Sequence, residues 1–240
     1  KFLVNELDLP TLKIASGELT DGPFLLEHAT TGRDILLSTG MATIGEIEEA
    51  LGVLAFGLYE GEQLKTAPSL RAFHEAYNSK EGQNLLKQKV TLLHCTTQYP
   101  TPINQINLNA MCRMHDTFGL RVGYSDHSQG IVVPVAAAAL GALVIEKHFT
   151  LNSNNAGPDH ASSLNPSELT NMVEAVRSVE LALGNGVKFP NANELENRLA
   201  ARKSLVATSP IALGEKYSHE TIAAKRPGSG KSPMRYWDMM

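Results

Sequence analysis

Short apolar runs that favour β-strands alternate with amphipathic stretches through residues 1–185, and this alternation restricts the fold more than any other feature. Each apolar run is compact and is followed by polar or glycine residues, as in the strands of a buried parallel sheet. Strands that alternate with helices predict an α/β fold with a parallel sheet. The expected strands are Thr11–Ser16, Asp34–Thr39, Lys89–Cys95, Arg121–Asp126 and Leu143–Phe149.

The intervening helices have readable ends. Thr43 followed three residues later by Glu46 forms a capping box at the start of one helix. Asn165, Pro166 and Glu168 supply the cap, the first turn and the N3 partner of another helix. That helix carries an apolar face and is expected to end at Gly184; the face comprises Leu169, Met172, Val173, Val176 and Val179.

Two architectures fit this alternation, an open doubly wound sheet and a (β/α)8 barrel. The chain has no Gly-x-Gly-x-x-Gly at a strand–helix turn and no P-loop, which disfavours a nucleotide-binding open sheet. Polar residues instead gather where the strands end, as at the mouth of a barrel. Five units are visible, so we expect about three more before Lys1, in agreement with the missing start methionine. The strand-end residues are Lys13, Ser16, Ser38, His94, Thr97, Ser125, His127, Glu146 and His148.

Composition argues against several partners. The chain has 21 Lys and Arg against 25 Asp and Glu, so no basic field is available for nucleic acid or acidic lipid. The longest apolar run, Ile131–Val144, is too short to span a bilayer and contains Pro134. Two cysteines, Cys95 and Cys112, make no disulfide framework, so the expected compartment is the reducing cytoplasm.

Two regions break the alternation. Leu58–Gln88 is an apparent insertion with one or two helices, because Leu70, Phe73 and Tyr77 share a helical face. After residue 187 the composition changes: residues 188–203 resemble a linker, and Ser204–Thr208 resembles a strand. We therefore expect a barrel domain over 1–187 and the start of a second small domain over 204–240.

His127 and His148 end consecutive expected strands, so their rings can approach each other across a barrel mouth. Two imidazoles with water and substrate oxygens suit a divalent ion such as Mn²⁺ or Zn²⁺. The alternative is a pair of strand-end histidines that bind no metal, and spacing alone does not decide between the two.

Lys13, Ser16, Ser38 and Ser125 combine one cation with small donors and suit a phosphate or carboxylate, although serines at such turns also serve as caps. Asp159 lies in the loop after the fifth strand, where it can hold sugar hydroxyls or be an ordinary turn residue.

Three side chains are candidates for covalent chemistry. Cys95 ends an apolar strand and is interpreted as a small buried residue rather than a nucleophile. Lys13 and Lys147 raise the possibility of a Schiff-base aldolase. Strand alternation points Lys147 away from Glu146 and His148, which counts against it.

Taken together, the chain resembles the sialic acid synthase family, which includes N-acetylneuraminate, legionaminate and pseudaminate synthases. The resemblance rests on seven motifs in family order that cover almost the whole chain outside Leu58–Gln88. They are Lys-Ile-Ala-Ser-Gly-Glu18, Leu-Ser-Thr-Gly-Met-Ala42, Leu-His-Cys-Thr-Thr-Gln-Tyr-Pro100, Gly-Tyr-Ser-Asp-His127, Ile-Glu-Lys-His-Phe-Thr150, Gly-Pro-Asp-His160 and Lys-Arg-Pro-Gly228.

The resemblance implies a (β/α)8 TIM barrel followed by a small antifreeze-like (SAF) domain that reaches into the partner subunit of a domain-swapped homodimer. The implied reaction condenses phosphoenolpyruvate with an N-acetylmannosamine-type sugar and releases phosphate. It uses a divalent metal, with Mn²⁺ expected and Mg²⁺ or Co²⁺ as alternatives. The upstream strands, with the family's N-terminal catalytic Glu, are absent, and the small domain is cut after Trp237.

By the same resemblance, His127 and His148 are metal ligands, and Glu146 has a catalytic role beside them. The phosphoenolpyruvate positions are Lys13, Ser16, Ser38 and Ser125, with Thr97 where the family often has Asn or Ser. Tyr99 and Asp159 match sugar-binding positions, and Arg226 matches an arginine delivered to the neighbouring subunit's sugar site. Gly-Pro-Asp-His-Ala-Ser162 favours the neuraminate and legionaminate branches over the pseudaminate branch. The competing hypothesis is a non-catalytic binding domain built on a decayed barrel.

Overall fold

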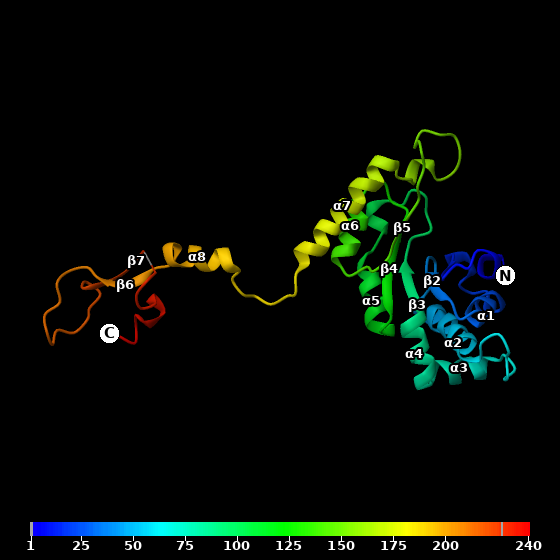
Figure 1. Cartoon of the computed structure of the whole chain (residues 1–240), viewed down its shortest axis with the longest axis horizontal. Coiled ribbons are helices and arrows are strands. Elements are labelled where there is room, and N and C mark those ends of the chain that lie inside the picture. The colour runs from blue at the N-terminus through cyan, green and yellow to red at the C-terminus, as the bar shows by residue number, and fades with distance from the viewer. Residues whose placement is uncertain (1, 227) are drawn as a thin grey trace. The chain divides into compact units, whose positions relative to one another are not determined.

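The computed structural model describes residues 2–226 and 228–240. The chain forms two compact units, Lys1–Gly184 and Asn185–Met240 (Figure 1). The candidate strand-end residues lie in the first unit, and Arg226 lies in the second.

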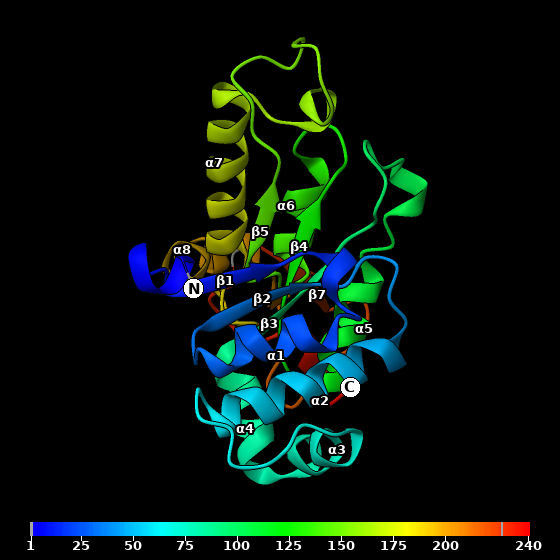
Figure 2. The same ribbon diagram turned by 90° about the vertical axis from the view of Figure 1, so that its right-hand side faces the viewer.

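The first unit is built on a five-stranded parallel sheet whose spatial order follows the sequence (Figure 2). The α/β class and the five expected strands are therefore confirmed, with small changes at the strand ends. Because all neighbours are parallel, all five carboxyl ends lie along one edge. The strands are β1 (Thr11–Ile14), β2 (Asp34–Ser38), β3 (Val90–His94), β4 (Arg121–Asp126) and β5 (Ile145–Lys147).

Helices follow the strands, and their ends match the sequence signals. Both expected capping boxes are present, at Thr43 with Glu46 and at Asn165 with Glu168. The second helix ends before Gly184, as predicted. The helices of the first unit are α1 (Gly22–Thr30), α2 (Ile44–Glu60), α3 (Leu70–Asn78), α4 (Lys80–Lys89), α5 (Asn109–Phe118), α6 (Val132–Ala139) and α7 (Pro166–Leu183).

One face of the sheet packs against the helices and forms the core. In β1 and β2 the buried Leu12, Ile14, Ile35 and Leu37 alternate with more exposed neighbours, the period of two expected for a strand. Helix residues such as Leu51 complete this apolar layer. The intervening strand positions therefore face the opposite side of the sheet, which carries the polar candidates.

That opposite side is strongly concave. The Lys13 ammonium on β1 lies 3.4 Å from the Glu146 carboxylate on β5, although β1 and β5 are the two outer strands of the sheet. In a flat sheet, strands spaced about 4.8 Å apart would separate these backbones by roughly 19 Å. The contact requires the sheet to curl so that its outer strands face each other, as in half of a barrel.

The region expected as an insertion is helical. The shared face of Leu70, Phe73 and Tyr77 corresponds to α3, and α4 leads directly into β3. Phe73 packs edge-on against Phe56 of α2, with ring centroids 5.2 Å apart. The two predicted helical segments are thus attached to the core through α2.

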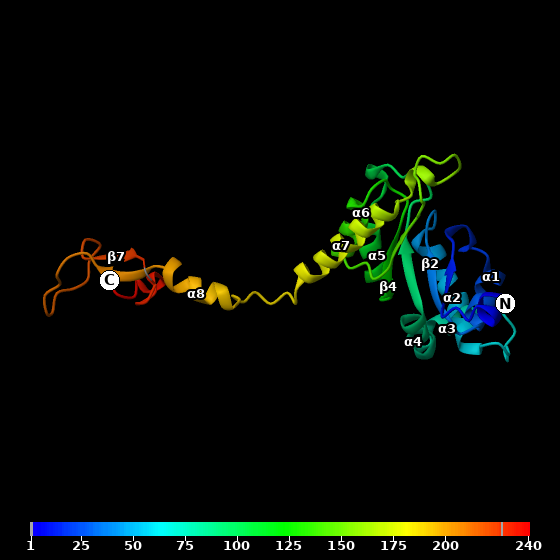
Figure 3. The same ribbon diagram turned by 45° about the horizontal axis from the view of Figure 1, so that its top comes forward.

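The second unit contains one α-helix and one antiparallel strand pair among its described residues: α8 (Ala192–Ala201), β6 (Ser204–Ala207) and β7 (Ile222–Lys225) (Figure 1; α8 and β7 also in Figure 3). The predicted linker 188–203 therefore contains a helix, capped by an Asn191–Glu194 capping box. The strand expected at Ser204 is present as β6.

Short helical turns complete the described chain, and none of its helices combines the length and apolar character needed to cross a bilayer. These turns are η1 (Phe2–Glu6), η2 (Ser16–Glu18), η3 (Ile103–Gln105), η4 (His160–Ser162) and η5 (Pro233–Arg235).

Gly123 on β4 is a test of how tightly the concave face is packed. A methyl group at this position would lie 2.5 Å from the Val144 carbonyl oxygen and 2.6 Å from Leu93 Cδ2. Gly123→Ala is expected to lower the free energy of unfolding by about 1–3 kcal/mol, the usual cost of overpacking. Gly45→Ala is the control, because a methyl group there meets nothing within 4 Å. Urea denaturation measures both, and equal stabilities would contradict the packing.

Candidate functional site

A three-residue polar cluster crosses the concave face. Glu146 Oε1 accepts a hydrogen bond of 2.8 Å from Ser125 Oγ, and Glu146 Oε2 faces Lys13 Nζ. Ser125 and Glu146 are register partners on β4 and β5, so their backbones bring them together. The Lys13 and Glu146 side chains are 33% and 37% exposed, so this ion pair remains accessible to a ligand.

His127 and His148 lie directly beyond the ends of β4 and β5. Their ring centroids are 5.4 Å apart and the rings are nearly perpendicular. Two residues earlier on each strand stand Ser125 and Glu146, so alternation places all four side chains on the same face. The structure therefore brings the two predicted histidines together.

The protonation state of His127 suits a ligand role. Its Nδ1–H donates to the Thr96 carbonyl at 2.8 Å, which leaves the lone pair of the neutral ring on Nε2. Burial lowers the pKa of His127, and the neighbouring His148 lowers it further. A neutral imidazole held by a backbone carbonyl is the usual arrangement of a metal-binding histidine.

The donor set fits a divalent ion held by few protein ligands. In the described residues no group of three or more His, Cys, Asp or Glu side chains is arranged to hold a metal. Two imidazole nitrogens leave the remaining coordination positions to water and substrate oxygens, an open site of the kind that catalytic metals use. The donor chemistry is therefore compatible with a metal bound together with its substrate.

Tyr99 and Asp159 border the histidine pair. The Tyr99 ring lies 4.1 Å from the His127 ring and 5.6 Å from the His148 ring, by centroids. Asp159 Oδ2 is 3.7 Å from His148 Nδ1. Asp159 has a positive φ of 68°, and its carbonyl accepts hydrogen bonds from the Ser162 and Ser163 hydroxyls, which fix the loop.

Hydroxyl groups converge around Gly40, at the ends of β1, β2 and β3. Ser16 Oγ and Thr97 Oγ1 lie 3.5 Å apart. A side chain at Gly40 would clash with the Thr97 hydroxyl and would lie 3.1 Å from Ser16 Oγ. The Ser38 hydroxyl is buried and has no hydrogen-bond partner among the described residues. Gly40 and the Ser16 and Thr97 hydroxyls beside it, with the buried Ser38 hydroxyl two residues earlier in the chain, form a small cradle for an oxygen-rich anion.

Cys95 and Lys147 do not present activated nucleophiles. Burial raises the pKa of the Cys95 thiol, so the thiol stays protonated at neutral pH. Lys147 Nζ forms an ion pair of 2.6 Å with Asp126 Oδ2, and both side chains are buried. Lys147 thus faces away from Glu146 and His148, as strand alternation predicts, and this placement disfavours a Schiff base at Lys147.

One member of the predicted set lies elsewhere, and one strand-end residue faces the helices. Arg226 follows β7 in the second unit, where its side chain is exposed. His94 is one of the strand-end residues expected at the mouth, but its Nε2 bonds the Ile106 carbonyl at 2.8 Å. Its ring lies near Tyr124, a core residue of the helix-facing layer.

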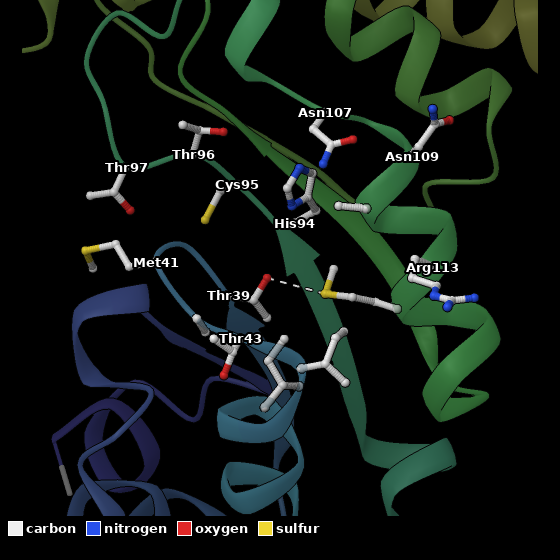
Figure 4. A pocket seen from close by; sticks show the side chains of 15 residues that line it. Thr39, Met41, Thr43, His94, Cys95, Thr96, Thr97, Asn107, Asn109 and Arg113 are labelled. Atoms are coloured by element: carbon white, nitrogen blue, oxygen red, sulfur yellow. Dashed lines mark hydrogen bonds between the residues drawn. The ribbon is translucent and has the colours of Figure 1, made fainter.

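A cavity of about 770 Å³ opens beside the hydroxyl cradle, between the N-terminal ends of α2 and α5 (Figure 4). Thr39 donates to Met114 Sδ across its floor at 3.5 Å. Cys95 and Thr97 line the cavity, but neither His127 nor His148 does. The cavity is thus a neighbour of the histidine pair and does not contain it.

The fold and the edge cluster define an α/β protein with a curved parallel sheet and a polar site at its carboxyl edge. The family model described as "NeuB family" matches residues 1–188, and the chain belongs to this family.

Relatives of this chain include N,N'-diacetyllegionaminic acid synthases. The protein of that name from Campylobacter jejuni is 45% identical, over 99% of this chain and 64% of its own length. That from Legionella pneumophila is 38% identical, over 97% and 58%. The structure of N-acetylneuraminic acid (sialic acid) synthetase from Leptospira borgpetersenii superposes with a TM-score of 0.64, 30% identity, and coverage of 81% of this chain and 58% of that one. The chain spans about three fifths of the length of these relatives.

His94 makes the stability of the first unit depend on pH. Burial lowers its pKa below the ordinary value of 6.5, so the folded protein binds fewer protons than the unfolded chain. The contribution of the neutral His94 side chain to the free energy of unfolding is fully present above about pH 6.5. It is lost as the pH falls through the lowered pKa of His94 in the folded protein. The melting temperature is expected to fall between pH 7.5 and 5, and to fall less in His94→Gln. An identical pH dependence in both proteins would contradict this origin.

Proposed function

We propose that the protein condenses phosphoenolpyruvate with an N-acetylmannosamine-type sugar to form a nine-carbon sialic or legionaminic acid and release phosphate. The observation that carries the proposal is the placement of a cation, a carboxylate and two histidines on one concave face, beside a hydroxyl cradle. The named activities of the relatives support it.

The proposed protein architecture is a (β/α)8 barrel with an antifreeze-like domain after it. The contact between Lys13 and Glu146 supports the barrel, because it requires the outer strands to face each other. Three further strands would close the barrel between β5 and β1. We also propose a domain-swapped homodimer that acts in the cytoplasm, where the free thiols of Cys95 and Cys112 are stable.

Phosphoenolpyruvate would lie across the cradle at Gly40. The hydroxyls of Ser16, Ser38 and Thr97 are hydrogen-bond donors for its phosphate and carboxylate oxygens, and the Lys13 ammonium supplies the balancing charge. The Ser38 hydroxyl is buried without a partner in the described chain, so a bound anion would satisfy it. Ser125, held by Glu146, would orient the other end of the molecule.

His127 and His148 would hold the divalent metal, Mn²⁺ in the first place and Mg²⁺ or Co²⁺ as alternatives. When bound, the metal would supply Lewis-acid polarisation of the sugar's open-chain aldehyde oxygen. The protein's part is to hold the two rings close together. For His127, burial lowers the pKa and favours the neutral ring, and the Thr96 carbonyl accepts the Nδ1–H so that Nε2 is left to bind.

The chemistry assigns a proton-transfer role to Glu146. C3 of phosphoenolpyruvate forms a bond to the aldehyde carbon, and C2 gains positive character. The aldehyde oxygen becomes an alkoxide. Water then adds to C2, the C–O bond to phosphate breaks and C2 becomes a ketone, so that the two protons of that water end on the alkoxide oxygen and on the released phosphate. A base is needed for the proton of that water, and the Glu146 carboxylate lies on the concave face beside the cation that would bind phosphate. Orienting both substrates in one complex can itself remove about 7–11 kcal/mol of the barrier.

The sugar would occupy the space bordered by Tyr99 and Asp159, next to the histidines. We propose a sugar of the legionaminate type. Identity to the two legionaminic acid synthases is 45% and 38%, against 32% and 36% for the pseudaminic acid synthases of Helicobacter pylori and Campylobacter jejuni. Arg226 would bind the acetamido group in the neighbouring subunit's site through its fork of donors.

The reaction is tested with the complete protein, phosphoenolpyruvate labelled with ¹⁸O at the bridging oxygen, Mn²⁺ and a panel of acetamido-mannose sugars. We expect a nine-carbon acid by mass spectrometry, with the label in released phosphate because the C–O bond breaks. His127→Ala should form no product and bind no stoichiometric metal. Label retained in the organic product, or borohydride trapping of pyruvate on Lys13, would refute the proposal; no turnover and no linked binding of metal and phosphoenolpyruvate would favour the binding domain.

Loss of Lys13 should weaken mainly the use of phosphoenolpyruvate, and loss of Arg226 should weaken mainly the binding of the sugar. Lys13→Met removes the cation proposed for phosphate, and its loss should cost about 1.5–3 kcal/mol, or roughly 10- to 150-fold in kcat/KM for phosphoenolpyruvate. Arg226→Ala should instead raise the KM for the sugar. Each variant is the control for the other in steady-state kinetics, and equal effects on both substrates in either variant would contradict the division.

A further inference from the structure

Asp126 and Lys147 form a buried ion pair in the helix-facing layer of the sheet. Their side chains are 0% and 2% exposed, and Lys147 Nζ lies 2.6 Å from Asp126 Oδ2. Every other ion pair among the described residues has side chains that are at least 30% exposed. A pair without solvent contact therefore needs an explanation that the surface pairs do not.

The pair stands at the last register position before the two histidines. Asp126 on β4 pairs with Lys147 on β5, and the next residues along the chain are His127 and His148. Since successive side chains point to opposite faces, the ion pair lies on the helix-facing side of the sheet, and the two rings lie on the concave side. It therefore joins the two strand ends from which the histidines project.

The same groups also close a ring around the backbone of His127. Asp126 Oδ1 accepts a hydrogen bond of 2.9 Å from the Ser128 amide, one residue beyond the histidine. Lys147 Nζ donates to the Ser128 carbonyl as well as to Asp126. The residues on both sides of His127 are thus tied to Lys147, the residue that precedes His148.

A gain in the free energy of unfolding does not explain why a buried ion pair is present here. Removing two charges from water is costly, and apolar replacements of similar volume often leave a protein equally stable. Buried pairs are better suited to selecting one geometry, because misaligned strands would leave the charges without partners. The observed register places the two charges opposite each other, and a slip of either strand would separate them.

We infer that Asp126 and Lys147 are positioning residues that fix the separation and orientation of the His127 and His148 rings from behind the sheet. The inference rests on the proposed function in that it assigns the paired rings to a divalent ion. The two side chains lie in the helix-facing layer, on the opposite side of the sheet from the concave face where substrate and metal would bind.

The test is the double variant Asp126→Asn, Lys147→Met in the complete protein. Asp126→Asn alone and Lys147→Met alone are both avoided, because each leaves a buried charge without its partner. The control is Asp34→Asn, Lys89→Met, which removes the half-exposed pair of 3.1 Å between Asp34 at the start of β2 and Lys89 at the end of α4. Both variants are measured for melting temperature, for Mn²⁺ affinity by calorimetry, and for ring geometry in metal-free crystals.

The expected result separates geometry from stability. The variant changed at Asp126 and Lys147 should melt within a few degrees of the parent, bind Mn²⁺ about 10- to 100-fold more weakly, and show altered His127–His148 ring separation. The control should match the parent in affinity and ring geometry. Parental affinity and separation in the first variant would overturn the inference, and so would failure of that variant to fold, because the pair would then hold the fold.

A parent that binds no Mn²⁺ would refute the metal part of the proposed function. The ring separation in metal-free crystals would still decide the inference. An unchanged separation would overturn it, and a changed separation with intact melting would support it. The two failures are therefore distinguishable.

Discussion

The register between β4 and β5 is the constraint on which the candidate site depends. Only three residue pairs join these strands, yet they place Ser125 opposite Glu146 on one face and Asp126 opposite Lys147 on the other. Because side chains alternate with a period of two, a slip of one residue would place side chains of the concave face on one strand opposite side chains of the helix-facing side on the other. The hydrogen bond, the buried ion pair and the approach of the two histidines would then all be lost.

Curvature is the second requirement, and it converts a row of strand ends into a site. Parallel strands alone would align Lys13 and Glu146 at opposite borders of the sheet, too far apart for contact. Twist and coiling bring these borders within 3.4 Å at the side-chain tips. Each strand therefore needs to contribute only one or two polar groups, while the helices pack against the convex side.

Local features of the fold could be predicted from the sequence because they depend on neighbouring residues. The strands, both capping boxes and the end at Gly184 follow from period and caps within a few positions. The Ser16–Thr97 contact joins residues 81 positions apart, and the Asp126–Lys147 pair joins residues 21 apart. Such contacts depend on register and curvature, which a single sequence does not encode locally. His94 shows the same limit, since strand-end position alone does not reveal which face it occupies.

The two faces of the strands separate stability from chemistry. Leu12, Ile14, Ile35 and Leu37 contribute to the core through the convex face, while the concave positions next to them carry Lys13 and Ser38. Changes at Lys13 or Ser38 can therefore alter binding without removing these four core side chains. Asp126 and Lys147 break this division, because they place opposite charges in the apolar layer. A costly pair at that point is understandable if the concave side requires one fixed arrangement of the strand ends, which apolar packing alone selects less strictly.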